Sequence, residues 1–158
     1  MPVYTIRRAN AGDTDAIMDL LAQVNRVHYE GRPDLFKLAT KYSPDELAVI
    51  FADDIRPVFV YADEQGRVLG HAFCELQRHE NSRLMTDIKT LYIHDLCVDE
   101  AARGHHVGKT LYEYVVAYAR GLGCYNVALN VWTLNQGALR FYEKCGLTPQ
   151  KIGMEKIL

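Results

Sequence analysis

A short glycine-bearing turn between two apolar segments constrains the fold of this chain more than any other feature. Residues 91–98 are largely apolar, and residues 107–122 carry apolar side chains at helical spacing, so a strand, a turn and a helix are predicted. Such a turn leaves the first backbone N–H groups of the helix without intrahelical partners, at the positive end of the helix dipole. Arg103 and Lys109 add two cations. The segment 103–110 is therefore predicted to bind a phosphate or pyrophosphate.

Two common phosphate-binding motifs do not match this turn. Residues 104–110 read G-x-x-x-G-K-T, one residue shorter than the G-x-x-x-x-G-K-[ST] loop of nucleoside triphosphatases. The dinucleotide fingerprint G-x-G-x-x-G is absent as well, because glycines occur only at positions 104 and 108 of this segment. We therefore expect a different phosphorylated ligand.

Composition favours one globular domain spanning residues 1–158, since 49% of the residues are hydrophobic and 24% are charged. A formal net charge of −2 gives no electrostatic footprint for nucleic acid. No apolar run is long enough to cross a bilayer, and residues 1–8 lack the apolar core of a signal peptide. We expect a cytoplasmic protein with no nucleic-acid or membrane partner.

The four cysteines, at positions 74, 97, 124 and 145, show no C-x-x-C spacing. We expect reduced, buried thiols inside the predicted elements. A metal site built from Cys97, His94 and the adjacent His105 and His106 fits no ligand-spacing template, so none is predicted.

The pattern of apolar and turn residues predicts an α/β (α+β) fold. We expect strands at residues 3–8, 57–62, 68–77, 89–98 and 126–132, and one or two more within 147–158. Helices are expected from Asp13 to about residue 28, from Ser43 to near residue 54, over 107–122, and from Asn135 to residue 145, with Asp13, Ser43 and Asn135 as caps. This order predicts a mixed, mainly antiparallel sheet with helices on both faces.

The strand at residues 89–98 has an interrupted alternation. Its apolar positions are 91 and 93, then 96 and 98, so the period of two slips across His94 and Asp95. One extra residue at that place predicts a β-bulge.

Two motifs in this order carry a family resemblance. Arg103-x-x-His106-x-Gly108, after Leu96-Cys97-Val98, is similar to a pyrophosphate loop written Q/R-x-x-G-x-G/A. The second motif is Asn135-x-x-Ala138-x-x-Phe141-Tyr142-Glu143-Lys144-x-Gly146-Leu147, about 30 residues further on. With both motifs, the chain resembles the GNAT superfamily of acyl-CoA-dependent N-acyltransferases over nearly its whole length.

The resemblance implies acetyl-CoA as cofactor and assigns residues to it. In the family two central strands splay apart and admit the pantetheine arm, here beside the backbone of Leu96, Cys97 and Val98. The pyrophosphate would be held by the turn, and the second motif is similar to the family's other cofactor motif. The implied residues are Arg103, Gly104, His105, His106, Val107, Gly108, Lys109, Thr110, Asn135, Ala138, Tyr142 and Lys144.

His106 departs from the family pattern, in which this position is glycine. If the position needs a positive φ, a side chain there is costly. If it is the first residue of a right-handed helix, His fits and its N–H still donates. We favour the second alternative.

For catalysis, the resemblance assigns Tyr142 as the acid that protonates the leaving thiolate, although a core aromatic would have the same helical spacing. An N–H at the bulge, from Cys97 or a neighbour, is a candidate oxyanion donor. His94 is our candidate general base with Asp95 beside it, because His titrates near neutrality. A His94 hydrogen-bonded within the sheet, or Glu30 as base, are the alternatives.

The acceptor side is the least determined part. Tyr29, Glu30 and Phe36 lie in a segment that mixes charge, aromatics and turn residues, and we expect it to border the acceptor. We predict an N-acetyltransferase that acts on a primary amine of a small molecule or peptide by direct transfer in a ternary complex. The alternative is a non-catalytic acyl-CoA-binding regulatory module. The family often pairs through its final strands, which implies a homodimer.

Overall fold

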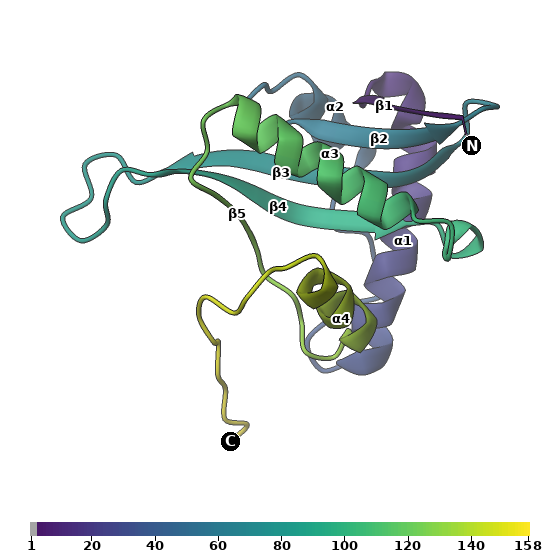
Figure 1. Ribbon diagram of the computed structural model, residues 1–158. Helices are drawn as coiled ribbons and strands as arrows, with labels where there is room; N and C mark the ends of the chain where they lie inside the picture. Colours follow the sequence, from purple (N-terminus) through teal and green to yellow (C-terminus); the bar gives the residue numbers. More distant parts are fainter. Residues whose placement is uncertain (1–2) are drawn as a thin grey trace.

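The computed structural model describes residues 3–158. Met1 and Pro2 belong to the segment 1–8, for which no signal peptide was expected, and they lie outside the described residues. The elements in chain order are β1 (Tyr4–Arg8), α1 (Thr14–Gly31), α2 (Pro44–Phe51), β2 (Val58–Asp63), β3 (Val68–Arg78), β4 (Lys89–Val98), α3 (Val107–Gly121), β5 (Asn126–Leu129) and α4 (Gln136–Lys144) (Figure 1). Short 3-10 helices at Ala11–Asp13 and Glu100–Ala102 precede α1 and α3.

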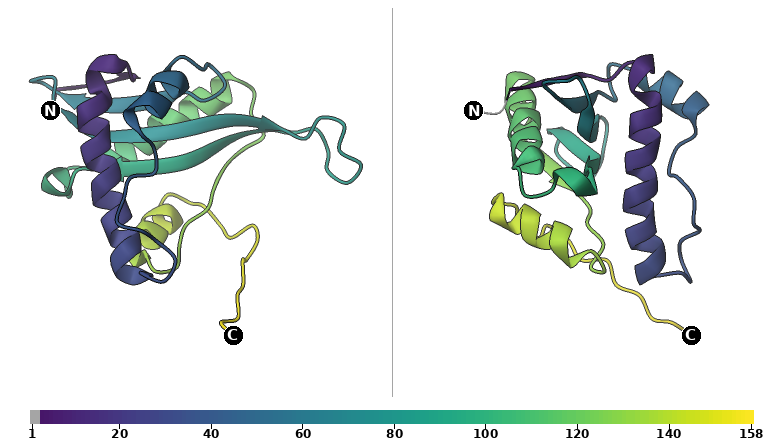
Figure 2. Two further views of the ribbon diagram at one scale, coloured as in Figure 1. Left: turned by 180° about the vertical axis from the view of Figure 1, so that it is seen from behind. Right: turned by 90° about the vertical axis from the view of Figure 1, so that its right-hand side faces the viewer.

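The five strands form one sheet in the order β1-β2-β3-β4-β5. Neighbours are antiparallel except β4 and β5, which run parallel because α3 crosses over between them. The helix α3 covers one face of the sheet, and α1 and α2 cover the other (Figure 2). The expected mixed, mainly antiparallel sheet with helices on both faces is confirmed.

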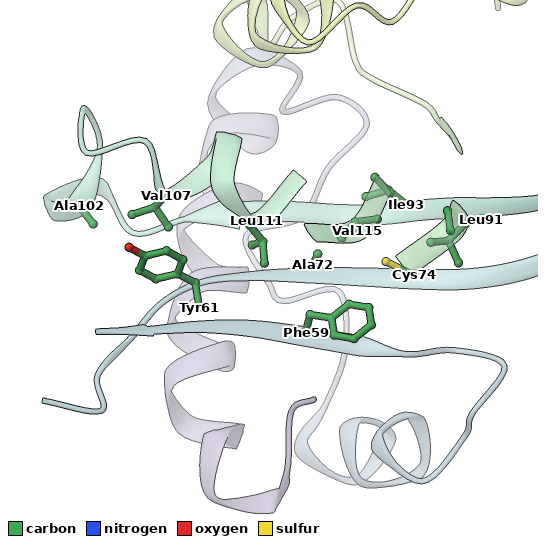
Figure 3. Packing of buried hydrophobic residues seen from close by; sticks show 11 residues of the cluster. Phe59, Tyr61, Ala72, Cys74, Leu91, Ile93, Ala102, Val107, Leu111 and Val115 are labelled. Carbon is green, nitrogen blue, oxygen red and sulfur yellow. The ribbon is translucent and has the colours of Figure 1, made fainter. Parts of the chain in front are cut away.

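The alternation of side chains across the strands divides the core into two layers. On the α3 side, Leu111 and Val115 are fully buried over Phe59 and Ala72 of the sheet. Figure 3 shows Val107, Leu111 and Val115 in a row above the strands. On the other side, residues of α1 and α2 such as Ile17 and Leu47 pack on alternate residues of β2 and β3.

The structure corrects the expected cap of α1. Asp13 makes no capping hydrogen bond from its side chain; it accepts two bonds from the Arg7 guanidinium, at 2.8 and 2.9 Å, and one from the Asn10 N–H. The preceding 3-10 turn moves the cap to Asn10, whose side chain accepts from the Gly12 N–H. The Ser43 capping box with Glu46 is confirmed.

The C-terminal expectations were partly wrong. The strand expected over 126–132 ends at Leu129, and the strands expected within 147–158 do not form. Residues 148–158 are all exposed. A strand forms only where a neighbour satisfies its backbone groups, and none of the described strands lies beside this segment.

All four cysteines are free thiols. Cys74 and Cys97 are buried within strands, and burial raises the pKa of each thiol to about 12. Cys124 and Cys145 are only half-buried and lie outside helices and strands, so the expectation that all four are buried inside elements was wrong for these two. No described helix is both long and apolar enough to span a membrane.

We predict that Asp13→Asn lowers the free energy of unfolding by about 2 kcal/mol at pH 7, because it leaves the half-buried Arg7 guanidinium without its carboxylate. The pKa of Asp13 is lowered, chiefly by its hydrogen bonds from Arg7. This stabilisation is therefore present above the unfolded-state pKa of about 3.9 and is lost as the pH falls through the lower folded-state pKa.

Urea unfolding at pH 7 and near pH 3 should show the gap between wild type and variant shrinking in acid. Asp15→Asn, at an exposed position in the first turn of the same helix, is the control and should change stability by no more than about 0.5 kcal/mol. An equal loss in both variants would contradict the role given to the Arg7–Asp13 pair.

Candidate functional site

The bulge lies where the sequence predicted it. Phe73 of β3 pairs with Asp95, whereas the next residue, Cys74, pairs with Ile93, so His94 has no partner in the register. The extra residue kinks β4 in its second half. His94 and Asp95 are thereby both presented on the face covered by α1 and α2.

Beyond the bulge, β4 and β5 part. Their parallel pairing covers Thr90–Ile93 of β4 and Asn126–Leu129 of β5 and then stops. In Figure 1 the chain leaves β5 and turns away from the sheet toward α4. Within residues 3–158, no strand pairs with the second half of β4 on that side, so backbone groups of the stretch Leu96 to Val98 that point away from β3 are open for a ligand.

The turn before α3 presents a row of open amides. Asp99 caps the short helix Glu100–Ala102, Gly104 has a φ of 86°, and α3 begins at Val107. The first helical hydrogen bond runs from the Thr110 N–H to the His106 carbonyl at 3.0 Å. The N–H groups at 107–109 precede that bond, so they are free to bind an anion at the positive end of the helix.

His106 corrects our expectation. It has φ 61° and ψ 19°, the left-handed conformation, and not the right-handed helical one that we favoured. The chain arrives in an extended conformation at Arg103 and needs a sharp reversal before Val107 can start the helix. A non-glycine residue in this conformation costs about 1–2 kcal/mol. The family motif has glycine at this position because glycine adopts a positive φ without strain. This chain has His106 there and bears the strain.

Gly108 has a packing role that the motif alone did not reveal. A Cβ added at this position would lie 3.3 Å from a Val98 methyl and 3.5 Å from the Phe141 ring. The missing side chain therefore lets β4 and α4 approach the start of α3. The two motifs of the sequence meet at this point.

The helix α4 carries the candidate acid. The Asn135 side chain accepts from the Ala138 N–H at 3.1 Å, which confirms the expected cap. Burial raises the pKa of Tyr142, and the nearby charge of Asp95 and the thiols of Cys145 and Cys97 raise it further. The phenol is therefore protonated at neutral pH, and it lies on the side of the parted half of β4.

His94 is held by a partner that the sequence did not indicate. Its Nε2 lies 2.9 Å from Oε2 of Glu75 on β3, and its ring packs edge-on against Tyr92. When Nε2 donates its hydrogen to this carboxylate, Nδ1 is left with a lone pair. A cavity of about 210 Å³ adjoins His94 and Glu75 and reaches Tyr42.

Asp95 has a different environment. Its carboxylate is 13% exposed and pairs with Lys41 at 3.0 Å. Burial raises the pKa of Asp95, and the Lys41 charge opposes that rise. Burial also lowers the pKa of His28, which feels the Asp95 charge. Lys41 and His28 therefore join this site, from a segment in which the sequence mixes charged, aromatic and turn residues.

The remaining histidine of the sheet is a poor base. His71 is fully buried on β3, opposite Cys97, and burial lowers its pKa to about 3. Elsewhere among the described residues, no three His, Cys, Asp or Glu side chains gather in a way that could hold a metal ion.

The three residues expected to border the acceptor lie in different environments. Phe36 packs against His28 with the two rings tilted by 30°, and it meets Trp132 edge-on, with ring centroids 5.0 and 5.1 Å apart. The loop after α1 therefore contacts the segment after β5. Tyr29 lies in the last turn of α1 and is half-buried. Glu30 beside it is exposed, and no hydrogen bond within residues 3–158 links it to His94 or Asp95. Trp132 was not singled out by the sequence.

Comparison with known proteins identifies similar chains. The family model described as Acetyltransferase (GNAT) family matches residues 21–147. A glucosamine 6-phosphate N-acetyltransferase of Arabidopsis thaliana is 37% identical over 68 residues, 43% of this chain and 44% of that protein. The glucosamine 6-phosphate N-acetyltransferase 1 of Oryza sativa subsp. japonica is 32% identical over 122 residues, 77% of this chain and 70% of that protein.

A solved structure agrees over a larger part of the chain. The crystal structure of a tetramutant of the BH1408 protein from Bacillus halodurans superposes with a TM-score of 0.94 at 30% identity and covers 98% of this chain and 99% of its own. The chain spans less than half of the Arabidopsis relative, so the substrate in that protein's name is evidence about that protein only.

We predict that His106→Gly raises the free energy of unfolding by about 0.5–1 kcal/mol, because glycine adopts a positive φ without steric cost. His105→Gly is the matched control. His105 has a negative φ, so glycine there brings only additional unfolded-chain entropy and should lower stability by several tenths of a kcal/mol. Urea unfolding of both variants measures the difference, and the reverse order would show that the left-handed turn is wrongly placed.

Proposed function

The chain belongs to the acetyltransferase (GNAT) family, and we propose that it moves an acetyl group from acetyl-CoA to the primary amine of a small molecule or peptide by direct transfer in a ternary complex. The observation that carries this proposal is the meeting of two open backbone surfaces. The amides at the start of α3 lie next to the end of the unpaired edge of β4, because Gly108 of α3 approaches the side chain of Val98.

The residues present fit coenzyme A. A Cβ added at Gly104, where φ is 86°, would meet no atom within 4 Å, so the turn leaves room beside its amides. Arg103 and Lys109 add positive charge for the pyrophosphate, with His105, His106, Val107, Gly108 and Thr110 supplying the backbone of the turn. Leu96, Cys97 and Val98 would bond the pantetheine amides, and Asn135, Ala138 and Lys144 would border the cofactor from α4.

The donor supplies a thioester, and the protein has two proton transfers to arrange. A primary amine with a pKa near 10.4 is only about 0.1% neutral at pH 7.4, so a base or water chain must remove its proton. We propose His94 for this task; the hydrogen bond to Glu75, which would orient the ring and leave Nδ1 as acceptor, supports the choice. Tyr142 keeps its proton at neutral pH and can give it to the departing thiolate.

The state of the thiols supports the proposal of direct transfer. Cys97 is the cysteine nearest the parted strands, and burial raises its pKa to about 12. Its hydrogen bond goes to the Leu20 carbonyl of α1. A protonated, buried thiol is a weak nucleophile, so the proposed route has no acyl-cysteine intermediate.

For the acceptor, we propose a chemical class, a primary amine, and the side from which it enters the site. The amine would reach His94 from the side of α1 and α2, between Asp95, Lys41 and the aromatic residues His28, Phe36 and Trp132. Tyr29 and Glu30 would border its outer part. Relatives that bear the name of glucosamine 6-phosphate make an amino sugar phosphate the first acceptor to test.

We predict that Tyr142→Phe lowers kcat for acetyl transfer by about 10²-fold or more while the affinity for coenzyme A stays within a factor of about three, because only the proton donor is removed. Thiol release from acetyl-CoA with a panel of amines gives the rate, and calorimetry gives the affinity. Tyr112→Phe, the same change on α3, is the control.

This experiment also separates the enzyme from a binding module. A wild-type protein that binds acetyl-CoA but releases no thiol with any amine, glucosamine 6-phosphate included, would favour the non-catalytic regulatory module. A fully active Tyr142→Phe would refute the acid assignment alone.

We predict that His94→Gln lowers kcat/KM by about 10²-fold or more and removes the acidic limb of its pH profile, because the group that must lose its proton before transfer is gone. Glu75→Gln should cause a smaller loss and keep an acidic limb, since it only weakens the orientation of His94. His79→Gln, in the connection between β3 and β4, is the control. An acidic limb that survives in His94→Gln but disappears in Asp95→Asn would move the base to Asp95.

A further inference from the structure

Lys41 carries a primary amine, which is the group that the proposed reaction consumes. On the basis of the proposed function we infer that Lys41 is itself an acceptor. When no free amine is bound, its ε-amine takes the acetyl group from acetyl-CoA, and the protein modifies its own chain at this position.

The amine of Lys41 lies inside the proposed acceptor site. Its Nζ is 3.0 Å from Oδ2 of Asp95, the carboxylate next to the candidate base. The Asp95 side chain is only 13% exposed, so the ion pair lies at the wall of the site. Lys109, by contrast, approaches Glu113 only to 4.0 Å, and those two side chains are 64% and 63% exposed. The ammonium of Lys41 therefore has the place that the amine of a free acceptor would take.

The path of the loop between α1 and α2 holds Lys41 over this carboxylate. The loop lies on the side of the sheet opposite α3 (Figure 2). Tyr42, the next residue, stacks on Phe73 with ring centroids 5.2 Å apart. Phe73 is the residue of β3 that pairs with Asp95 in the register, and the Ser43 cap starts α2 directly afterwards. Lys41 is thus fixed beside Asp95 by its anchored neighbours.

The proposed cofactor would bring its thioester to the same end of the open edge. The amides for the pyrophosphate adjoin Val98, since a Cβ at Gly108 would lie 3.3 Å from its side chain. From there the unpaired edge of β4 runs back through Leu96 to Asp95. A pantetheine arm along this edge would end near Asp95. The Lys41 side chain is 45% exposed, so its amine can turn from the carboxylate to the thioester without disturbing the core.

The surroundings of Lys41 keep its amine protonated in the free protein. Burial alone would lower the pKa of Lys41, but the Asp95 carboxylate outweighs burial, and the pKa is raised. The other titratable groups near the ammonium are Tyr42, Tyr92, His28 and His71. Less than about 0.1% of such an amine is neutral at pH 7.4. Tethering offsets this small fraction, because a group held at the site has a very high effective concentration.

The transfer leaves coenzyme A as its second product. Nζ forms a bond to the carbonyl carbon of the thioester, and the carbon–sulfur bond breaks. The ammonium loses two protons when it becomes an amide. One would pass to solvent by way of His94, and the other balances the proton that Tyr142 gives to the departing thiolate. The products are an acetylated Lys41 and the free thiol of coenzyme A.

The test is incubation of the purified protein with acetyl-CoA and no added amine. The mass of the intact chain should rise by one acetyl group, and peptide mapping should place that group on Lys41. Lys37, an exposed lysine of the same loop, is the internal control and should remain unmodified. Lys41→Arg keeps a cation beside Asp95 and should gain no acetyl group.

A second measurement separates catalysis from the uncatalysed reaction of acetyl-CoA with lysines. Tyr142→Phe should slow the modification of Lys41 about tenfold or more, because the proposed proton donor is removed. Tyr112→Phe, the same change on α3, should leave the rate unchanged. The rate per chain should not vary with protein concentration, since the acceptor and the site belong to one chain. In urea, Lys41 should react no faster than Lys37.

An unmodified Lys41, equal modification of Lys37 and Lys41 in the folded protein, or a rate that rises with protein concentration would overturn this inference. Turnover of added amines is measured separately. Turnover with an unmodified Lys41 would refute self-acetylation and leave the proposed function intact, whereas a folded protein that takes up no acetyl-CoA would refute both.

Discussion

The site depends on one extra residue in β4. With His94 outside the register, β4 kinks, its second half has no partner at β5, and Asp95 turns with His94 toward α1 and α2. β5 ends at Leu129, opposite Ile93, so the backbone of Leu96 to Val98 has no strand partner on that side. The bulge therefore creates both an open strand edge for a cofactor and a place for a base beside it.

The turn before α3 adds a second feature of the site, and its conformation has an energetic cost. The amides at 107–109 face the open part of β4 because His106 turns the chain in a left-handed conformation, which is unfavourable for a residue with a side chain. Gly108 then lets Val98 and Phe141 meet the helix. At the proposed cofactor site, β4 and α4 thus pack closely against the start of α3. Elsewhere α4 has no fully buried residue, and residues 148–158 after it are exposed.

Local signals predicted most of the elements. The bounds of β4, the capping box at Ser43 and the cap at Asn135 follow from nearby residues, because periodicity and capping act over three or four positions. The same locality explains two errors. Asp13 has the right residue type for a cap, but Arg7 on β1 takes its carboxylate. Residues 147–158 were expected to form one or two closing strands, but a strand needs a neighbour, and no pattern within the segment supplies one.

The amino-acid sequence by itself determined the order of elements, the bulge at His94 and Asp95, and the two motifs that place the chain in its family, since each is written in contiguous residues. Only the tertiary structure decided that Glu75 holds His94, that Lys41 pairs with Asp95, and that His106 is left-handed. These partners are separated by 19 and 54 positions along the chain. Contacts over such separations arise from the way strands and loops pack, and backbone strain is set by the path that the chain must follow between them.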